Sequence, residues 1–156
     1  MSNVRVKIKK LSENAKIPSY GSEGAAGFDI HALSDTTILP GYTALVSTGL
    51  SFEIPEGFEL QIRPRSGMSL KTKLRIANAP GTIDSDYRGH VQIIAENTSN
   101  NAAEVINVKA GDRIAQGVLA RVNRAVFTEV SEELETTQRG EGGFGSTGVS
   151  EPISDS

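Results

Sequence analysis

The sequence predicts an all-β sandwich or barrel with at most one short helix, and two observations support this fold class. Apolar and polar residues alternate with a period of two in many short runs; in VRVKIK (4–9), for example, Val4, Val6 and Ile8 share one face. Turn signals such as Pro40-Gly41 and Gly111-Asp112 separate these runs at close intervals. Many short strands between frequent turns are typical of all-β domains.

Each element follows from the same criterion. Strands are predicted over residues 4–9, 36–39, 42–47, 58–63, 90–97, 103–108, 113–122 and 125–130. One or two helical turns are predicted in SGMSLKTK (66–73), with Ser66 as the N-cap. From about Glu132 the alternation ends and Gly, Ser, Thr and Glu dominate. We therefore expect a β domain over residues 1–131 and a flexible C-terminal arm over residues 132–156.

Composition limits the classes of function. The chain has 156 residues, a net charge of −3 and no cysteine, so disulfides, thiolate nucleophiles and cysteine-ligated metals are excluded. The acidic balance argues against a protein that coats nucleic acid. No apolar run is long enough to cross a membrane, and the first residues lack the apolar centre of a secretory signal. We expect a cytoplasmic protein, with a nuclear or viral origin left open.

The glycine-rich stretch RGEGGFGSTG (139–148) contains the spacing G-x-G-x-x-G, which is a weak signal when it stands alone. A dinucleotide-binding loop also needs a following helix and an acidic residue about 20 positions further on. Two interpretations stay open: a flexible tail, or an arm that wraps an anion. In the second, Arg139 and the Ser146 and Thr147 hydroxyls donate hydrogen bonds, and Phe144 stacks on a flat base. A spacer has no need of Phe144, which favours the arm.

Two polar groups stand out in the body, and the first of them suggests an anion site. In PRSG, Arg65, Ser66 and Gly67 lie where a short helix begins, and backbone donors there favour a phosphate. The alternative is a capped turn with surface arginines. Gln116 lies in an otherwise apolar strand, where its amide needs a polar partner.

Acidic residues offer two further candidates. Asp84 and Asp86, in IDSDYRG, either activate water or cap a turn. Asp29, in AGFD, is flanked by apolar residues, so it either forms a buried hydrogen bond or contacts an ion.

These stretches together resemble a known family. AGFD, PRSG, IDSDYRG, GDRIAQ and RGEGGFGSTG follow the order of the five motifs of trimeric dUTP pyrophosphatases (dUTPases), from about residue 3 to 148. The resemblance implies a jelly-roll-like β-barrel subunit in a homotrimer with shared active sites, each completed by a partner's C-terminal arm. It also implies hydrolysis of dUTP to dUMP and pyrophosphate by attack of water on the α-phosphorus. This reaction limits uracil incorporation into DNA and supplies dUMP for dTTP synthesis.

The resemblance assigns roles to individual residues. Asp84 would activate the water, Tyr87 would exclude a 2′-hydroxyl, and Asp29 would contact the cofactor Mg²⁺ through water. The remaining substrate-binding residues would hold the phosphates, read the uracil edge and close the arm. They are Arg65, Ser66, Gly67, Asn78, Thr82, Ile83, Gln92, Gln116, Arg139, Phe144, Gly145, Ser146 and Thr147.

Two positions depart from the family pattern. Thr82 stands where an aliphatic residue is usual, and Gly117 replaces a larger apolar residue, which we expect to loosen the strand contacts. The alternative functions are a dCTP deaminase-like enzyme and a nucleotide-sensing interaction module. The deaminase branch needs a glutamate about ten residues after the hairpin aspartate, where this chain has Ile94.

Overall fold

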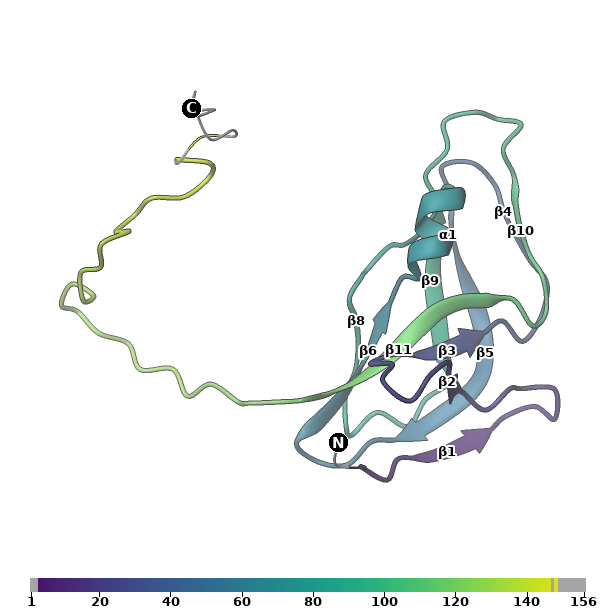
Figure 1. Cartoon of the computed structure of the whole chain (residues 1–156), viewed down its shortest axis with the longest axis horizontal. Coiled ribbons are helices and arrows are strands. Elements are labelled where there is room, and N and C mark those ends of the chain that lie inside the picture. Colours follow the sequence, from purple (N-terminus) through teal and green to yellow (C-terminus); the bar gives the residue numbers. More distant parts are fainter. Residues whose placement is uncertain (1–2, 147, 149–156) are drawn as a thin grey trace, which may run out of the picture. The chain divides into compact units, whose positions relative to one another are not determined.

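The structure is a computed structural model that describes residues 3–146 and 148. It divides the chain into two compact units, Met1–Asn123 and Arg124–Ser156. All the helices and strands assigned in the described residues lie in the first unit (Figure 1). The boundary falls shortly after the last strand, and before the expected limit at residue 131.

The first unit is almost entirely β-structure, which confirms the predicted fold class. Its single helix in the described residues, α1, spans Ser66–Lys71. The strands are β1 Lys7–Lys10, β2 Ser19–Tyr20, β3 Phe28–His31, β4 Thr36–Ile38, β5 Thr43–Glu53, β6 Phe58–Arg63, β7 Leu74–Ile76, β8 Gly81–Ile83, β9 Val91–Asn97, β10 Ile106–Val108 and β11 Arg113–Arg121.

The strands form three antiparallel sheets and not one closed barrel. One sheet has the order β1-β5-β9-β7, another β2-β3-β11-β6-β8, and β10 pairs with β4 in a small third sheet. Alternation decides which side chains are buried: along β9, Val91, Ile93 and Ala95 are buried while Gln92 is exposed. Buried residues of both large sheets, such as Ile93 and Leu60, belong to one hydrophobic core.

Two details of the sequence prediction are wrong. Residues 125–130 form no strand, although all are described, and Val126 and Phe127 are each 93% exposed. Their alternation is genuine, but a strand requires a ladder partner, and this segment has none within the described chain. Ser66 is the first helical residue instead of the N-cap, which is Arg65 and makes no side-chain capping bond in the described structure.

The structure also corrects the expectation for Gly117 of β11. A Cβ atom at Gly117 would lie only 2.4 Å from Cε2 of Phe28, so the Phe28 ring fills the space that a larger residue would take. The same ring meets Tyr20 edge to face, with centroids 5.6 Å apart. The strand contacts at Gly117 are therefore tight.

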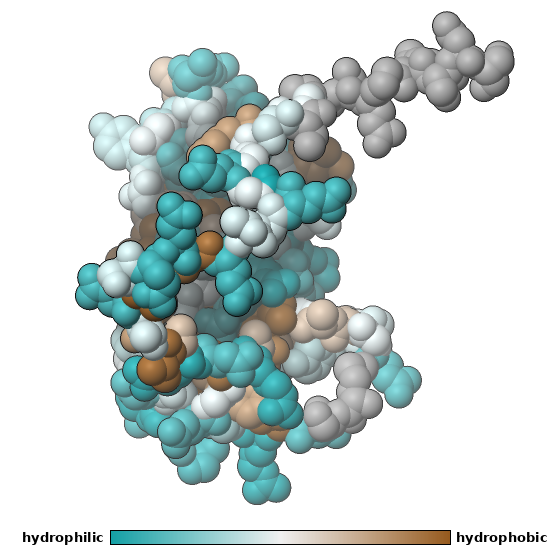
Figure 2. Space-filling model, turned by 90° about the vertical axis from the view of Figure 1, so that its left-hand side faces the viewer, coloured by the Kyte–Doolittle hydropathy of each residue, from teal (hydrophilic) through white to brown (hydrophobic). Residues whose placement is uncertain are grey.

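No helix in the described residues is long and apolar enough to cross a membrane. On the face drawn in Figure 2, hydrophobic residues show as patches among hydrophilic ones.

Candidate active site

Four polar side chains gather where β3, β11 and the end of β6 meet; we call Asp29, Arg65, Arg113 and Gln116 the Asp29 cluster. The strand order explains the gathering, because β11 lies between β3 and β6 and places Gln116 opposite both Asp29 and Arg63. Arg65 follows β6 by two residues. Its Nε lies 2.9 Å from Oδ1 of Asp29, and Nη1 of Arg113 donates to Oδ2 of Asp29 at 3.4 Å.

Hydrogen bonds to the backbone hold the rest of the cluster. The Gln116 amide donates from Nε2 to the carbonyl oxygen of Pro64 at 2.8 Å. This bond is the polar partner that we expected for an amide in an otherwise apolar strand. A Cβ atom at Gly27 would lie 2.4 Å from Oε1 of Gln116, so a glycine makes room for this amide. Arg65 donates from Nη1 to the carbonyl oxygen of Arg113 at 3.3 Å.

The cluster carries an excess of positive charge, because one carboxylate faces two guanidinium groups. His31 lies opposite Arg113 on β3. Burial lowers the pKa of His31; the positive charges of Lys16, Arg113 and Arg65 lower it further, and only Asp29 opposes them. Its Nδ1 is buried and has no hydrogen-bond partner among the described residues. The excess of positive charge in the Asp29 cluster favours an anion of high charge.

The predicted residues Ser66 and Gly67 are exposed and directly follow Arg65 at the start of α1. The structure therefore brings together five of the predicted site residues: Asp29, Arg65, Ser66, Gly67 and Gln116. Arg113 was not singled out from the sequence. The available signal was its position in GDRIAQ, three residues before Gln116 on the same strand.

A second group of predicted residues surrounds β8. Thr82 and Ile83 lie opposite Gln61 and Leu60 of β6. The exposed Asn78 packs against Gly81, where an added Cβ would lie 3.3 Å from Nδ2 of Asn78.

Beyond β8, Asp84 is exposed and its carbonyl oxygen accepts the Tyr87 amide at 3.2 Å. The Tyr87 side chain is 44% exposed and its hydroxyl donates to the carbonyl oxygen of His90 at 3.1 Å. Gln92 is exposed on β9, opposite Ser47.

Asp84 and Arg65 lie toward opposite ends of β6. The antiparallel register places Ile83, which precedes Asp84, at the level of Leu60, whereas Arg65 lies five residues further along the chain. At about 3.3 Å per extended residue, roughly 16 Å separates these two levels. One chain therefore does not bring Asp84 to the Asp29 cluster.

The glycine-rich stretch of the second unit forms a turn. The Ser146 amide donates to the carbonyl oxygen of Gly143 at 3.0 Å, and the central residues Phe144 and Gly145 have φ values of 50° and 81°. Two positive φ values mark a turn of type I′, in which a bulky residue is strained. Phe144 is fully exposed, and Nε of Arg139 donates to the carbonyl oxygen of Gly142 at 2.8 Å. Thr147 lies outside the described residues.

The residues present can accommodate a magnesium ion in one limited way. The described chain contains no group of three or more His, Cys, Asp or Glu side chains placed to hold a metal. Asp29 offers a single carboxylate beside the cationic groups that would bind phosphates. Mg²⁺ commonly binds through one or two carboxylates, several waters and substrate phosphates. The donor set fits an ion of that kind.

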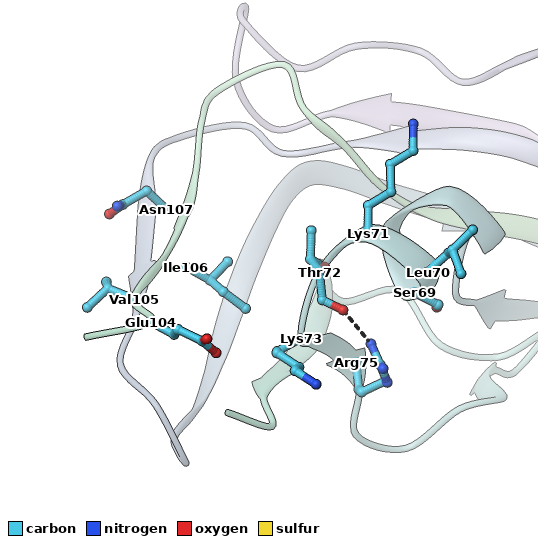
Figure 3. A pocket seen from close by; sticks show the side chains of 10 residues that line it. All are labelled: Ser69, Leu70, Lys71, Thr72, Lys73, Arg75, Glu104, Val105, Ile106 and Asn107. Atoms are coloured by element: carbon cyan, nitrogen blue, oxygen red, sulfur yellow. Dashed lines mark hydrogen bonds between the residues drawn. The ribbon is translucent and has the colours of Figure 1, made fainter. Parts of the chain in front are cut away.

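A separate hollow of about 570 Å³ lies beside α1, β7 and β10 (Figure 3). It contains none of the predicted site residues. Its cationic residues do not converge: Lys71 points away from Lys73, and Arg75 donates from Nη1 to the Thr72 carbonyl oxygen at 3.0 Å. We therefore place the candidate active site elsewhere, in the Asp29 cluster and in residues 78–87 around β8, which we call the β8 hairpin.

Known proteins resemble the chain over this whole region. The dUTPase family model matches residues 13–148. The deoxyuridine 5′-triphosphate nucleotidohydrolase of Helicobacter hepaticus is 53% identical over 149 residues, covering 96% of this chain and 92% of the relative. That of Nautilia profundicola is 52% identical over 145 residues, covering 93% and 99%.

Solved structures give the same result. The dUTPase of Staphylococcus bacteriophage 80alpha with dUPNHPP has a TM-score of 0.86 and 29% identity, covering 94% of this chain and 100% of that one. A mutant dUTPase from phage phi11 of S. aureus, described for its coordination of a structural Mg(II) ion, has a TM-score of 0.75 and 26% identity, covering 83% and 98%. Sequence and fold together show that this chain belongs to the dUTPase family.

Proposed function

We propose that this chain hydrolyses dUTP to dUMP and pyrophosphate, with the Asp29 cluster, the β8 hairpin and the glycine-rich turn as the parts of its active site. The observation that carries this proposal is the match of the dUTPase family model to residues 13–148, a range that includes all three groups. Relatives named for this activity are more than half identical to the chain.

Asp84 is the proposed general base. A water oxygen attacks the α-phosphorus as the Asp84 carboxylate accepts a proton from that water. The bond from the α-phosphorus to the oxygen that it shares with the β-phosphorus breaks, and pyrophosphate leaves with that oxygen. The exposed carboxylate follows a paired strand and its backbone is fixed by the Tyr87 amide, which is the kind of positioning that this chemistry requires.

The Asp29 cluster would bind the phosphates. In the structure Arg65 and Arg113 both contact Asp29, so their guanidinium groups are already held close together before a ligand arrives. A triphosphate carries more negative charge than one carboxylate and would attract both arginines. Ser66, Gly67 and Gln116 would add neutral donors.

Asp29 is the residue that would hold Mg²⁺, through water, alongside the substrate phosphates. When bound, the ion would polarise the phosphate oxygens. The role of the chain itself is to keep a carboxylate beside the phosphate site.

The β8 hairpin would select the nucleoside. Asn78, Thr82, Ile83 and Gln92 would read the uracil edge, and the Tyr87 ring would pack under the deoxyribose and leave no space for a 2′-hydroxyl. The hydrogen bond from the Tyr87 hydroxyl to the His90 carbonyl oxygen supports the assignment of Tyr87, because it orients the ring.

We further propose a homotrimer with shared active sites. A site that uses both Asp84 and the Asp29 cluster needs at least two copies, because these groups lie at opposite ends of β6 in one chain. Residues 132–156 would be the arm that completes the site, with Arg139, Gly145, Ser146 and Thr147 at the phosphates. The exposed Phe144 would stack on the uracil.

Turnover tests the proposal directly. The protein is incubated with Mg²⁺ and either dUTP or dCTP, and both pyrophosphate and ammonia are measured. We expect pyrophosphate from dUTP and no ammonia from dCTP. Ammonia release would favour the deaminase alternative, and dUTP binding without pyrophosphate would favour the nucleotide-sensing module.

A further inference from the structure

The segment between Tyr87 and His90 joins the β8 hairpin to β9, and it is seated with little freedom. The Tyr87 ring lies over Gly89, since an added Cβ there would be 2.3 Å from the Tyr87 hydroxyl oxygen. That hydroxyl donates to the His90 carbonyl oxygen at 3.1 Å. The orientation of the ring therefore depends on where the backbone of His90 lies.

The His90 side chain fixes that backbone. Its Nε2 accepts the Gly49 amide at 3.0 Å and lies 3.0 Å from Oγ of Ser47. A backbone N–H can only donate, so Nε2 carries no proton here and the Ser47 hydroxyl donates as well. The Gly49 amide and the Ser47 hydroxyl therefore share the one lone pair of Nε2.

The donors come from an irregularity in β5. Its pairing with β9 shifts register between Ser47 and Leu50, and Gly49 has a φ of 68°. Bulges of this kind redirect backbone groups and side chains next to functional sites. Here the irregularity aims the Gly49 amide at His90 instead of at a ladder partner.

β5 also donates two side-chain hydrogen bonds to carbonyl oxygens on either side of His90 in the chain. Oγ of Ser51 donates to the Arg88 carbonyl oxygen at 2.7 Å, and Oγ1 of Thr48 donates to that of Val91 at 2.5 Å. Both residues are buried, so these bonds lie in a part of the molecule where water does not compete freely.

We propose that His90 is a positioning residue for sugar selection, acting through the Tyr87 hydroxyl. This inference rests on the proposed function, in which Tyr87 excludes the 2′-hydroxyl. The Nε2 acceptor holds the His90 backbone against the β5 irregularity, and the His90 carbonyl in turn holds the Tyr87 ring flat against Gly89. Without the acceptor, the ring gains freedom to tilt and to admit a ribose.

A matched pair of amides tests the acceptor. In His90→Gln the side-chain amide oxygen reaches the position of Nε2. In His90→Asn the side chain is one methylene shorter, so its oxygen does not reach that position. We expect His90→Asn to lower the ratio of kcat/KM for dUTP over UTP about tenfold, and His90→Gln to keep it within about threefold. The control Thr37→Ala, which removes the 3.0 Å bond to Oδ1 of Asn107 between β4 and β10, should leave the ratio unchanged.

A double-mutant cycle tests the route through Tyr87. Tyr87→Phe removes the hydroxyl and should itself lower the ratio; adding His90→Asn should then cost little more. Fully additive losses, or equal ratios for His90→Asn and His90→Gln, would overturn the inference.

Tyr87→Ala distinguishes a failure of the inference about His90 from a failure of the proposed role of Tyr87. If it relaxes the rejection of UTP while His90→Asn does not, the inference about His90 fails alone. If Tyr87→Ala also leaves the rejection intact, the proposed role of Tyr87 fails and the inference falls with it. Urea unfolding of each variant shows that a changed ratio does not come from a loss of folded protein.

Discussion

The two ends of β6 hold their functional groups in different ways. At the Arg65 end, Asp29, Arg65 and Arg113 contact one another as ion pairs. At the β8 end, Asp84 is exposed and its side chain makes no hydrogen bond or ion pair within the described chain. There, neutral hydrogen bonds from β5 and from Tyr87 fix the backbone. One end thus holds its carboxylate in ion pairs, while the other leaves a carboxylate exposed beside a hydrogen-bonded backbone.

Replacing the free carboxylate should have the largest effect. Asp84→Asn should lower kcat by about 10³-fold, because a positioned general base typically contributes 10²- to 10⁴-fold. Binding of a non-hydrolysable dUTP analogue, followed by calorimetry, should change little. Asp86→Asn, two residues away, is the matched control and should lose far less. Equal losses in the two variants would remove the special role of Asp84.

Removing a charge at the other end should act on binding. Arg65→Ala should raise the KM for dUTP roughly 10- to 100-fold, as expected for the loss of charge-assisted hydrogen bonds. The matched control is Arg63→Ala, which removes an exposed arginine bonded to Gln61 of the same strand. If Arg65→Ala lowered only kcat, the division of labour between the two ends would be wrong.

A packing change beside the Asp29 cluster should act on stability. Gly117→Ala would place a Cβ 2.4 Å from the Phe28 ring and should lower the free energy of unfolding by about 1–3 kcal/mol. Phe28→Leu added to it should recover part of the loss. Urea denaturation measures both; a Gly117→Ala variant as stable as the parent would show that the ring moves aside without cost.

Ion pairs away from both ends should matter least. The Ala110 amide, and then Lys109, lower the pKa of the exposed carboxyl of Asp35. A carboxyl with a lowered pKa in the folded state stabilises the fold above its ordinary pKa near 3.8, and this contribution is lost as pH falls through the lowered value. Asp35→Asn should therefore change stability slightly at neutral pH and not at all in strong acid. A large loss of stability at neutral pH would contradict the expectation that the exposed ion pair of Asp35 matters less than the ion pairs of Asp29.

The sequence was sufficient for the fold class because period-two alternation survives in longer strands such as β9, and in the first part of β5. It was insufficient for β2, β3, β7 and β8, which have two to four residues each and are too short to show a clear period. For residues 125–130 the alternation predicted a strand that does not form, because strand pairing is a tertiary property. No local sequence says where a ladder partner will be.

For the candidate site, motif residues were predictable and their grouping was not. Asp29, Arg65 and Gln116 come together only because β11 lies between β3 and β6, a strand order that the sequence does not reveal. Arg113 was not singled out for the same reason: its partner Asp29 lies far away in the chain. The role of Asp84 remains a prediction.

The packing of Phe28 against Gly117 has an evolutionary consequence. Residues 28 and 117 face each other across β3 and β11 and share one volume, so neither is free to change size alone. A relative with a larger residue at the position of Gly117 should carry a smaller one at that of Phe28, because volume-conserving exchanges are tolerated best. The departure at Gly117 is then half of a compensated pair, and the two positions should covary among related chains.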